Sequence, residues 1–397
     1  MKKHLLLLLF AMAALFTQAQ NKPYITKVYE LTPAPGQFIN TLPTYVYAQN
    51  ESPDSVIARA EKALCGTMTI EESELPDGTI VCDTAMNVSP GMISLGSYGG
   101  YVVFGFDHPV VNVKDEYDLQ IFGNAFQAAG SSSSGGSSEP GIVMVSRDYN
   151  GNGIPDDPWY ELAGSEYNNP KTQKHFRITY YKPDDSQFTG AHNYPEYIRW
   201  TCNSVDSLTE GYVSKISFHS QSYWPQWVKG ESLTFEGTKL PCNAVDESGE
   251  GTYWVQHFYD WGYVDNKPDN RYDGSAVESN MNLGFKIDWA VDDNGRRVNL
   301  HKIDFVKVYN GVLQQCGWLG ETSTEVCGAI DLHPQQALSL IHGDVNVDGS
   351  VNVSDITALI NMIMDFTPTD VELGDVNGDT RVNVSDITAL IDIIMNS

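Results

Sequence analysis

The sequence predicts a mainly β protein in which a large, jelly-roll-like β-sandwich domain precedes a small α-helical module. Two observations predict this architecture. Short runs rich in Val, Ile, Tyr and Phe recur between clusters of Gly, Pro, Asn and Asp over most of the chain, a spacing typical of sandwiches and barrels. At the end of the chain, the stretch at 343–364 returns almost unchanged at 374–395, and each copy closes on apolar residues at helical spacing.

The N-terminus predicts export. A basic stretch at 2–4 precedes an apolar run at 5–16, and small residues follow at 17–19, the pattern of a secretory signal peptide. The run is too short to span a bilayer, and no later stretch reaches about 18 apolar residues, so we expect no transmembrane anchor. We therefore expect residues 1–19 to be removed and the protein to be secreted, extracellular and in part associated with the cell surface.

Charge excludes two classes of partner. The formal net charge is −27 and the isoelectric point is about 4.5. A chain this acidic is repelled by nucleic acid and by anionic membranes, so neither is expected as a partner. The excess of carboxylates suits an extracellular protein that binds calcium.

The cysteines permit disulfides, because their number is even and the protein is expected outside the cell. The pairs favoured by proximity in the sequence are 65 with 82, 202 with 242, and 316 with 327. The alternative is that some are buried free thiols. The six residues are Cys65, Cys82, Cys202, Cys242, Cys316 and Cys327.

We expect four segments along the chain: the signal peptide, a β-sandwich ligand-binding domain at 20–333, a linker at 334–342 and the helical module at 343–397. Within the β domain, strand-like runs include 101–106, 118–123, 141–146, 176–181, 214–219 and 303–309. A helix is expected at 52–64, where Ser52 or Asp54 caps an apolar pattern at helical spacing. The composition of 130–141 predicts a flexible loop.

Each copy of the C-terminal repeat has the ligand spacing of an EF-hand calcium loop. Oxygen donors fall at loop positions 1, 3, 5, 7, 9 and 12, with position 7 giving its backbone carbonyl. The first copy supplies Asp344, Asn346, Asp348, Ser350, Asn352 and Asp355, and the second supplies Asp375, Asn377, Asp379, Arg381, Asn383 and Asp386. Position 6, where the chain turns sharply, holds Gly349 in the first copy but Thr380 in the second, so Thr380 is expected to strain its turn.

Each loop leads into a helix with an apolar stripe, and the two stripes are expected to pack on one another. The members are Ile356, Leu359, Ile360, Ile363 and Met364 in the first helix and Ile387, Leu390, Ile391, Ile394 and Met395 in the second. Since one loop–helix unit has nothing else against which to bury its stripe, duplication completes the core. Without metal the acidity of the segment opposes folding, so we expect folding coupled to Ca²⁺.

This duplicated unit, with Asp at position 12 and no preceding helix, resembles a type I dockerin. The resemblance implies two bound Ca²⁺ ions, attachment to a cohesin domain on a scaffold or surface protein, and a role in polysaccharide breakdown. In dockerins, residues at loop positions 10 and 11 largely determine which cohesin is recognised. These positions hold Val353 and Ser354 in the first copy and Val384 and Ser385 in the second. Their identity in both copies implies two equivalent docking faces. The alternative is that the module caps the protein or docks on its own chain.

A third candidate calcium loop lies in the β domain. Its oxygen donors are Asp148, Asn150, Asn152, Asp156 and Asp157, and Gly151 and Gly153 permit the turn. Position 12 is Trp159, so the spacing is not that of a standard EF-hand. The alternative is a metal-free turn rich in Asn and Gly.

Aromatic residues concentrate in two stretches, 221–231 and 251–266. Exposed aromatic rings stack on the apolar faces of sugars, so these stretches predict a glycan-binding platform. The candidate ligand-binding residues are Tyr223, Trp224, Trp227, Trp254, Tyr259 and Trp261. The alternative is that each ring belongs to the core of a large sandwich.

The stretches 95–112, 122–126, 139–166, 259–266 and 317–333 resemble an uncharacterised family of exported or cell-surface β-sandwich proteins of Bacteroidetes. The resemblance spans most of 24–333. It implies the fold and the location and leaves the ligand open, with a glycan or a corrinoid as candidates.

We expect a binding protein rather than an enzyme. The alternative is a dockerin-borne polysaccharide-degrading enzyme of the glycoside hydrolase type, which needs two carboxylates facing each other across a cleft. No nucleophile-elbow, zinc-protease or phosphate-loop motif is present in the sequence. The glutamates that stand as catalytic candidates are Glu161, Glu166, Glu236, Glu321 and Glu325.

Overall fold

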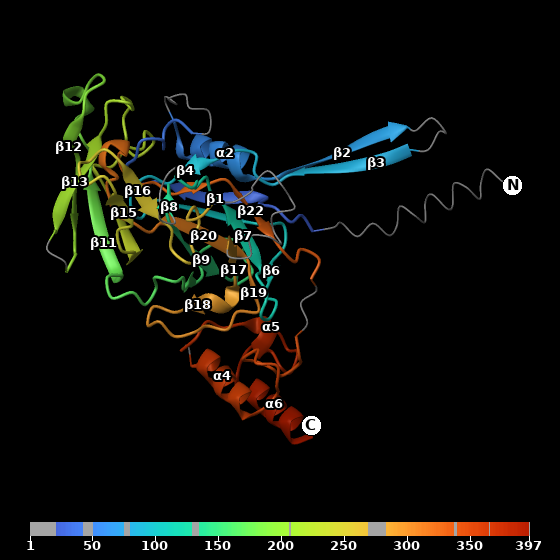
Figure 1. Ribbon diagram of the computed structural model, residues 1–397. Coiled ribbons are helices and arrows are strands. Elements are labelled where there is room, and N and C mark those ends of the chain that lie inside the picture. Colours follow the sequence, from blue (N-terminus) through green and yellow to red (C-terminus); the bar gives the residue numbers. More distant parts are fainter. Residues whose placement is uncertain are drawn as a thin grey trace.

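The computed structural model describes residues 21–42, 51–74, 80–128, 135–205, 208–268, 283–336, 340–364 and 366–396. The expected signal peptide at 1–19 lies outside these residues, as does part of the loop expected at 130–141. The chain is mainly β with a small helical region at its C-terminal end, as the sequence predicts (Figure 1). We call residues 21–333 the β domain and residues 343–396 the C-terminal module.

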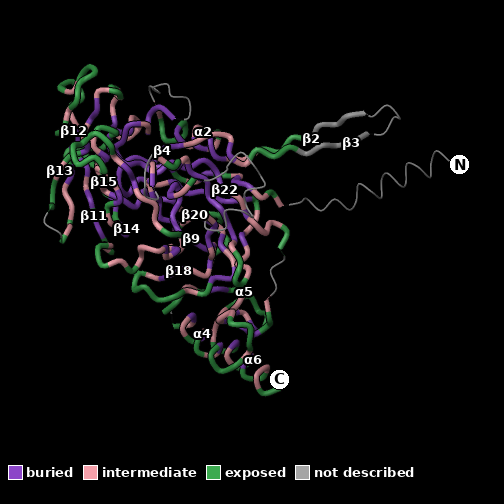
Figure 2. Tube along the Cα trace, in the orientation of Figure 1, coloured by how far each residue is buried: buried purple, intermediate pink, exposed green. Residues whose placement is uncertain are grey.

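A six-stranded antiparallel sheet forms the centre of the β domain. Its strand order is β1 (Lys27–Thr32), β5 (Tyr101–Gly105), β20 (Phe305–Asn310), β9 (Gly141–Ser146), β10 (Trp159–Leu162) and β18 (Ala290–Val291). The central strands are rich in Val and Phe because both faces of this sheet are buried (Figure 2). Side chains that alternate along each strand therefore enter two different cores.

The first core lies on one face of the central sheet. Val102 and Phe104 of β5 pack there with helix α2 (Pro53–Leu64) and with a small sheet. This sheet has the order β17 (Gly284–Phe285), β7 (Leu119–Phe122) and β22 (Gly328–Asp331). The helix begins where the sequence predicts, since Ser52 forms a capping box with Ser55.

The second core lies on the opposite face and is rich in aromatic rings. It packs Ile142 and Tyr309 of the central sheet against a four-stranded sheet. The order of this sheet is β13 (Glu210–Lys215), β12 (Tyr194–Cys202), β11 (Gln173–Tyr181) and β14 (Ser232–Lys239). The β domain is thus a sandwich whose central sheet is covered on both sides.

Shorter elements complete the β domain. Strands β2 (Thr67–Glu74) and β3 (Ile80–Asn87) form a hairpin that projects from the body (Figure 1). The other pairings are β15 (Ala244–Asp246) and β8 (Gly135–Gly136) with β16 (Trp254–His257), β19 (Lys302–Ile303) with β6 (Val110–Val111), and β21 (Glu325–Val326) with β4 (Ile93–Ser94). The 3-10 turns are η1 (Asp185–Gln187), η3 (Ile287–Trp289) and η4 (Gly317–Leu319).

The C-terminal module contains α4 (Val353–Ile363), α5 (Val371–Gly374) and α6 (Val384–Asn396). Its small core is built by α4 and α6 around Leu359 and Leu390, which are fully buried. The two apolar stripes meet as predicted only in part, because Ile360, Met364 and Met395 stay exposed. Among the described residues, no helix has the length and apolar character needed to cross a membrane.

The predicted disulfide pairs are wrong in this structure. Cys65, Cys202, Cys242 and Cys316 are unbridged thiols, so each of the three pairs lacks at least one partner. The Sγ atoms of Cys202 and Cys242 lie beside different backbone carbonyls, those of Leu208 and Leu313. Burial raises the pKa of the Cys316 thiol to about 12 and that of Cys65 to about 11, so both stay protonated and unreactive.

Candidate functional site

The first loop of the C-terminal module holds its carboxylates in a closed ring of hydrogen bonds. Asp344 accepts from the backbone N–H of Asp348 at 3.1 Å and from that of Gly349 at 2.8 Å. Asp355, at the start of α4, accepts from the N–H of Asn346 at 3.0 Å. Because Asp355 is fully buried, its negative charge lies inside the loop rather than in water. Burial, together with the nearby carboxylates of Asp355 and Asp348, raises the pKa of Asp344, so the acids at positions 1, 5 and 12 lie near one another, as calcium coordination requires.

The side chains of the remaining candidate ligands of the first loop also accept hydrogen bonds from backbone N–H groups within the loop. The side-chain oxygen of Asn346 accepts from the N–H of Asp348 at 3.0 Å, and that of Asp348 accepts from Ser350 at 3.0 Å. Asn352 caps α4 by accepting from the N–H of Ser354 at 2.9 Å. These short-range bonds explain why ligand spacing in the sequence translates directly into loop geometry.

The second loop repeats this network. Asp375 accepts from the N–H groups of Asp379 at 2.9 Å and Thr380 at 2.8 Å. Asp386, fully buried, accepts from Asn377 at 3.1 Å and from Asn383 at 2.9 Å. Arg381 donates its backbone N–H to Asp379 at 3.0 Å, in the place that Ser350 takes in the first loop. The two loops are therefore equivalent down to their backbone donors.

The β-domain loop at 148–157 shares the first half of this geometry. Asp148 accepts from the N–H groups of Asn152 at 3.1 Å and Gly153 at 2.7 Å, and Asn150 accepts from Asn152 at 2.9 Å. Positions 4 and 6 have positive φ in all three loops: Gly151 and Gly153 here, Val347 and Gly349 in the first, Gly378 and Thr380 in the second.

The second half of the β-domain loop differs. Trp159, at position 12, belongs to strand β10, so it cannot close the ring. Asp157 takes over this place by accepting from the N–H of Tyr149 at 3.2 Å, and Asp156 accepts from the side chain of Asn152 at 3.2 Å. The five donors predicted from the sequence therefore lie together in one loop.

Replacing Thr380 by Gly is expected to stabilise the C-terminal module by about 1 kcal/mol. Thr380 has a φ of 68°, a left-handed conformation that a β-branched residue adopts only with strain and glycine adopts freely. The measurement is the melting temperature of the helical circular dichroism in saturating calcium. The matched control, Gly349→Thr, is expected to lower it. An unchanged melting temperature in Thr380→Gly would show that the turn carries no strain.

The residues predicted to contact a partner stand on equivalent exposed sites. Val353 is 67% exposed and Val384 is 66% exposed, each at the first residue of its helix. Ser354 and Ser385 accept through their hydroxyls from Asn346 at 2.9 Å and Asn377 at 2.7 Å. Each Val–Ser pair is thus held in place by its own calcium loop.

Comparison with known families supports this geometry. Residues 342–395 match the model of the dockerin type I domain. The C-terminal module is a type I dockerin. Dockerins bind calcium, attach to cohesin partners and are typically found on extracellular proteins. No curated protein matches the chain.

The dockerin also packs on its own chain through a buried cluster of charges. Arg147, at the end of β9, forms ion pairs with Asp370 and, at 2.9 Å, with Glu372 of α5. Lys302 reaches the same Glu372 carboxylate at 2.5 Å. Since Val353 and Val384 stay exposed, this internal docking leaves both predicted partner faces open.

His301 completes the charge cluster in its neutral form. Burial, together with the positive charge of Arg147, lowers the pKa of His301 to about 4. Its Nδ1 lies 3.3 Å from Nη1 of Arg147, a distance at which a neutral ring nitrogen accepts from the guanidinium. Burial opposes ionisation of Glu372, but the hydrogen bond and charge of Lys302, with Arg147, lower its pKa. The positive charges of Lys302 and Arg147 therefore favour the ionised form of Glu372.

Two of the aromatic residues predicted to bind a ligand belong to the core. Tyr223 is fully buried and Trp224 is 3% exposed, both in the second core. The prediction of an exposed platform is wrong at these two positions. The backbone carbonyls of Ser222 and Trp224 bind the amide of Asn40 at 3.0 and 2.9 Å, which fixes this stretch against the sandwich.

The other predicted aromatic residues are dispersed over the β domain. Trp227 packs on the first core beneath the guanidinium of Arg59. Tyr259 donates its hydroxyl to the carbonyl of Pro241 and stays half-buried. Trp261 is 37% exposed and stacks on Trp289 with ring centroids 4.5 Å apart. The six residues therefore do not form one surface.

Trp254 instead lies against Gly317, the neighbour in the chain of Trp318, an aromatic residue that the sequence analysis did not single out. Trp318, in η4, is 53% exposed, and its indole N–H donates to the carbonyl of Thr252 at 3.4 Å. The indole of Trp254 donates to Gly251 at 3.3 Å and lies against the backbone of Gly317, where a side chain would clash. Tyr253, beside them in the chain, is 37% exposed. We call these three residues the Trp254–Trp318 surface.

The glutamates proposed as catalytic candidates are separated in the structure. Glu161 and Glu236 line one cavity of about 210 Å³ with Lys174. Burial raises the pKa of Glu161 and lowers that of Lys174 to about 8. Glu166 accepts from the side chain of Asn169 at 2.6 Å and so stabilises a turn. Two others, Glu321 and Glu325, are buried elsewhere in the β domain.

Proposed function

We propose that this chain is an exported, calcium-stabilised protein whose dockerin attaches it to a cohesin-bearing partner while its β domain binds a glycan. The observation that carries the proposal is the pair of equivalent calcium loops, each presenting an exposed Val–Ser pair, within the segment that matches the dockerin family. Such a protein takes part in polysaccharide breakdown by placing its β domain beside the other proteins on the same scaffold.

Three calcium ions are proposed, two in the dockerin and one at 148–157. The third is supported by the same sequence of Asp and Asn acceptors, with positive φ at positions 4 and 6, that both dockerin loops show. Because Asp148 accepts from one end of this loop and its N–H donates to Asp304 at 2.9 Å, an ion there stiffens the loop against the central sheet.

Cohesin binding is expected to survive loss of either Val–Ser pair and to be abolished by loss of both. Val353→Asp with Ser354→Asp places negative charge on one face only, and the second face remains intact. Calorimetry with a type I cohesin domain in calcium measures the effect. Combining these changes with Val384→Asp and Ser385→Asp is expected to weaken binding more than 100-fold, or about 3 kcal/mol. Full affinity in the fourfold variant would refute the assignment of the docking faces.

The glycan proposal rests on the Trp254–Trp318 surface. Both indole N–H groups are tied to carbonyls of a single turn, Gly251 and Thr252, so the rings are held in fixed orientations. Pre-oriented rings lose little entropy when they stack on a sugar, and the partly exposed faces leave room for one. The surface lies in the β domain, so that it and the docking faces can be occupied together.

Affinity electrophoresis of the full chain through gels cast with plant and host polysaccharides tests this surface. Trp318→Ala is expected to abolish retardation, since each aromatic stacking contact contributes about 1–3 kcal/mol. Trp261→Ala, which removes another partly exposed tryptophan elsewhere in the β domain, is the control and is expected to migrate like the parent. Free migration of the parent chain in every glycan would exclude the glycan-binding proposal.

A second candidate, a glycoside hydrolase, is favoured only by the cavity that holds Glu161 and Glu236. A buried carboxyl with a raised pKa beside a second carboxyl is the arrangement of a general acid. The cavity, at about 210 Å³, is smaller than pockets that hold a sugar unit with its neighbours. Release of reducing sugar by the parent chain, lost in Glu161→Gln, would favour the hydrolase.

A further inference from the structure

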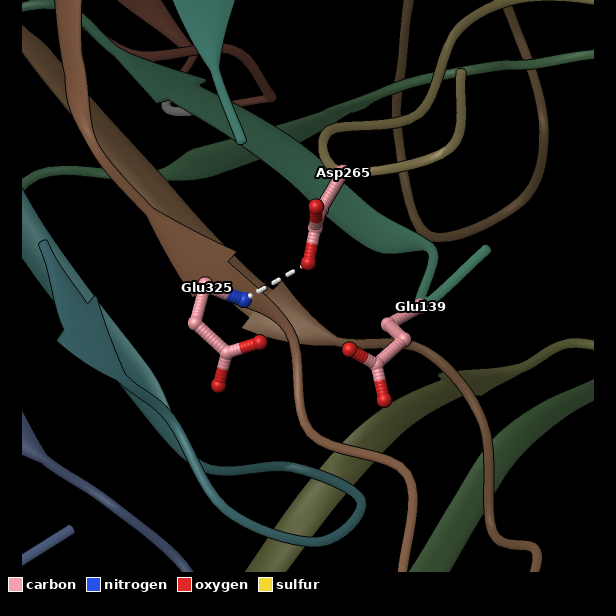
Figure 3. A group of neighbouring side chains, drawn as sticks. All are labelled: Glu139, Asp265 and Glu325. Carbon is pink, nitrogen blue, oxygen red and sulfur yellow. Dashed lines mark hydrogen bonds between the residues drawn. The ribbon is translucent and has the colours of Figure 1, made fainter. Parts of the chain in front are cut away.

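Three carboxylates from distant parts of the chain meet inside the β domain. Glu139 precedes β9, Asp265 follows β16 and Glu325 begins β21. One oxygen of each lies within 4.8 Å of the others. Figure 3 shows the carboxylates of Glu139 and Glu325 turned towards one another, with Asp265 beside them. We call these residues the carboxylate trio.

Asp265 is fixed in place by the backbone around it. Its Oδ1 accepts from the N–H groups of Asn124 at 2.7 Å and Ala125 at 2.8 Å. Its Oδ2 accepts from the N–H of Glu325 at 2.9 Å. These bonds hold the carboxyl group of Asp265, which is 3% exposed, at the point where the other two acids converge.

Glu325 presents an oxygen with no partner. The residue is 4% exposed, and its Oε1 has no hydrogen-bond partner among the described residues. A buried carboxylate oxygen without a donor has lost its hydration and gained nothing in return, which is costly. The carboxyl group of Glu325 otherwise contacts the hydroxyl of Ser94 and the carboxyl of Glu139, so the partner of Oε1 is either a proton shared with Glu139 or a bound cation.

The carboxylates of Glu139 and Glu325 have no cationic side chain as partner in the described part of the chain. No ion pair there joins Glu139 or Glu325 to Lys, Arg or His. Placing acids this close together in a buried site requires either protons or a cation. A proton shared between Glu139 and Glu325 would supply the partner that Oε1 lacks, and a cation supplies it while also neutralising the charge that one shared proton leaves on the two glutamates.

We propose that the carboxylate trio binds one calcium ion. Carboxylate oxygens are hard ligands that suit Ca²⁺ and Mg²⁺. Two oxygens on opposite sides of Ca²⁺, each at about 2.3–2.6 Å, stand about 5 Å apart, whereas across Mg²⁺ they stand about 4 Å apart. All three oxygens lie within 4.8 Å of one another, so one divalent ion of either size can contact all three carboxylates, and Ca²⁺, whose ligand number and geometry are the more flexible, is the ion we test. The hydroxyls of Ser94 and Ser323, 2.6 Å from each other, lie beside the glutamates as further oxygen donors.

An ion at the trio adds a direct link among three segments that are distant in the sequence and that already meet through hydrogen bonds. Glu139 leads into the central sheet, and Asp265 ends the stretch that carries Tyr259 and Trp261. Glu325 begins a strand that pairs with β4. The site is thus a structural one, distinct from the calcium loop at 148–157 and from both dockerin loops.

The test uses the full chain with its three loops disabled by Asp148→Ala, Asp344→Ala and Asp375→Ala. After equilibration with calcium and removal of free ion, elemental analysis is expected to find one calcium per chain. The melting temperature of the β domain is expected to fall by several degrees when a chelator is added. A chain that retains no calcium and melts at the same temperature with and without chelator would overturn the proposal and leave a proton-sharing trio.

Variants of the trio localise the ion. Adding Glu325→Gln to the loop-disabled chain is expected to remove the bound calcium and the effect of chelator. Asp118→Asn, which neutralises another fully buried carboxylate of the β domain, is the matched control and is expected to retain the ion. Near-ultraviolet circular dichroism reports whether each variant is folded. Calcium that persists in a folded Glu325→Gln chain would place the ion elsewhere and overturn the assignment. Retention or loss of this calcium leaves the proposals on cohesin and glycan binding unaffected.

Discussion

Chelation of calcium is expected to unfold the dockerin while the β domain stays folded. The dockerin core is small: among the described apolar side chains of the module, those that are buried are Val345, Leu359, Met362, Val376 and Leu390. Its two loops hold their acids together, and Asp355 and Asp386 are fully buried. Without Ca²⁺ these charges repel one another at low dielectric, which so small a core does not offset. The measurement is the helical circular dichroism at 222 nm of the full chain, titrated with chelator.

The expected result is loss of the signal from α4 and α6, restored by excess calcium. The β domain, with two large cores, is expected to keep its near-ultraviolet spectrum. Asp344→Ala combined with Asp375→Ala is expected to give the same loss in the presence of calcium. A conservative control, Ser350→Ala, keeps the backbone carbonyl that serves as ligand and is expected to behave as the parent. Full helicity in chelator would show that the dockerin folds without metal.

The dockerin could be predicted from the sequence because its chemistry is local. Ligands at alternate positions of one loop become neighbours as soon as the loop curls, as the bonds from Asp344 to Asp348 and Gly349 show. The helix at 52–64 could be predicted for the same reason, since its cap and its apolar pattern lie within one turn of each other.

The aromatic residues could not be placed by the same reasoning. Alternation along a strand separates the two faces of a sheet, but here both faces of the central sheet are buried. Tyr223 and Trp224 lie outside the strands, between β13 and β14, so alternation along a strand says nothing about them, and both are buried in the second core. Trp318 was not predicted because it is more than sixty residues from Trp254 in the sequence. Only the folded chain places the neighbouring Gly317 against Trp254.

Contacts between segments that are distant in the sequence cannot be predicted from a local pattern in one sequence. Glu139, Asp265 and Glu325 are separated by long stretches, and nothing around each residue distinguishes it from other acids in this very acidic chain. The disulfide prediction failed similarly, because proximity in sequence does not bring Cys202 to Cys242. These sites depend on strand order, which the sequence predicts only as a class.

Replacing Arg147 by Ala is expected to release the dockerin from the β domain. The Arg147 side chain is 5% exposed and that of Asp370 is 4% exposed, so this is a buried ion pair. Removing one member leaves the other charged and desolvated, at a cost of about 3–5 kcal/mol. The dockerin avoids this cost by separating from the β domain, because the carboxylate of Asp370 is then hydrated. Small-angle scattering in saturating calcium is expected to show a larger radius of gyration.

We expect a large increase in the radius of gyration because few other contacts hold the dockerin against the β domain. Clefts of about 530 and 490 Å³ flank it, so apolar packing between the two parts is incomplete. Lys302→Ala is the matched control: its ammonium is more exposed, at 18%, and Arg147 still neutralises the acids, so only a small change is expected. Unchanged scattering by Arg147→Ala would show that other contacts suffice.

A compensating variant separates loss of charge balance from loss of packing. Arg147→Met with Asp370→Leu removes both buried charges and fills similar volume, a replacement that is often close to neutral for stability. The double variant is expected to restore the compact scattering profile of the parent. Restoration would mean that the ion pair sets the orientation of the dockerin without being needed for adhesion. In that case Arg147 and Asp370 fix where Val353 and Val384 point relative to the Trp254–Trp318 surface, and so the orientation of the β domain relative to a bound cohesin.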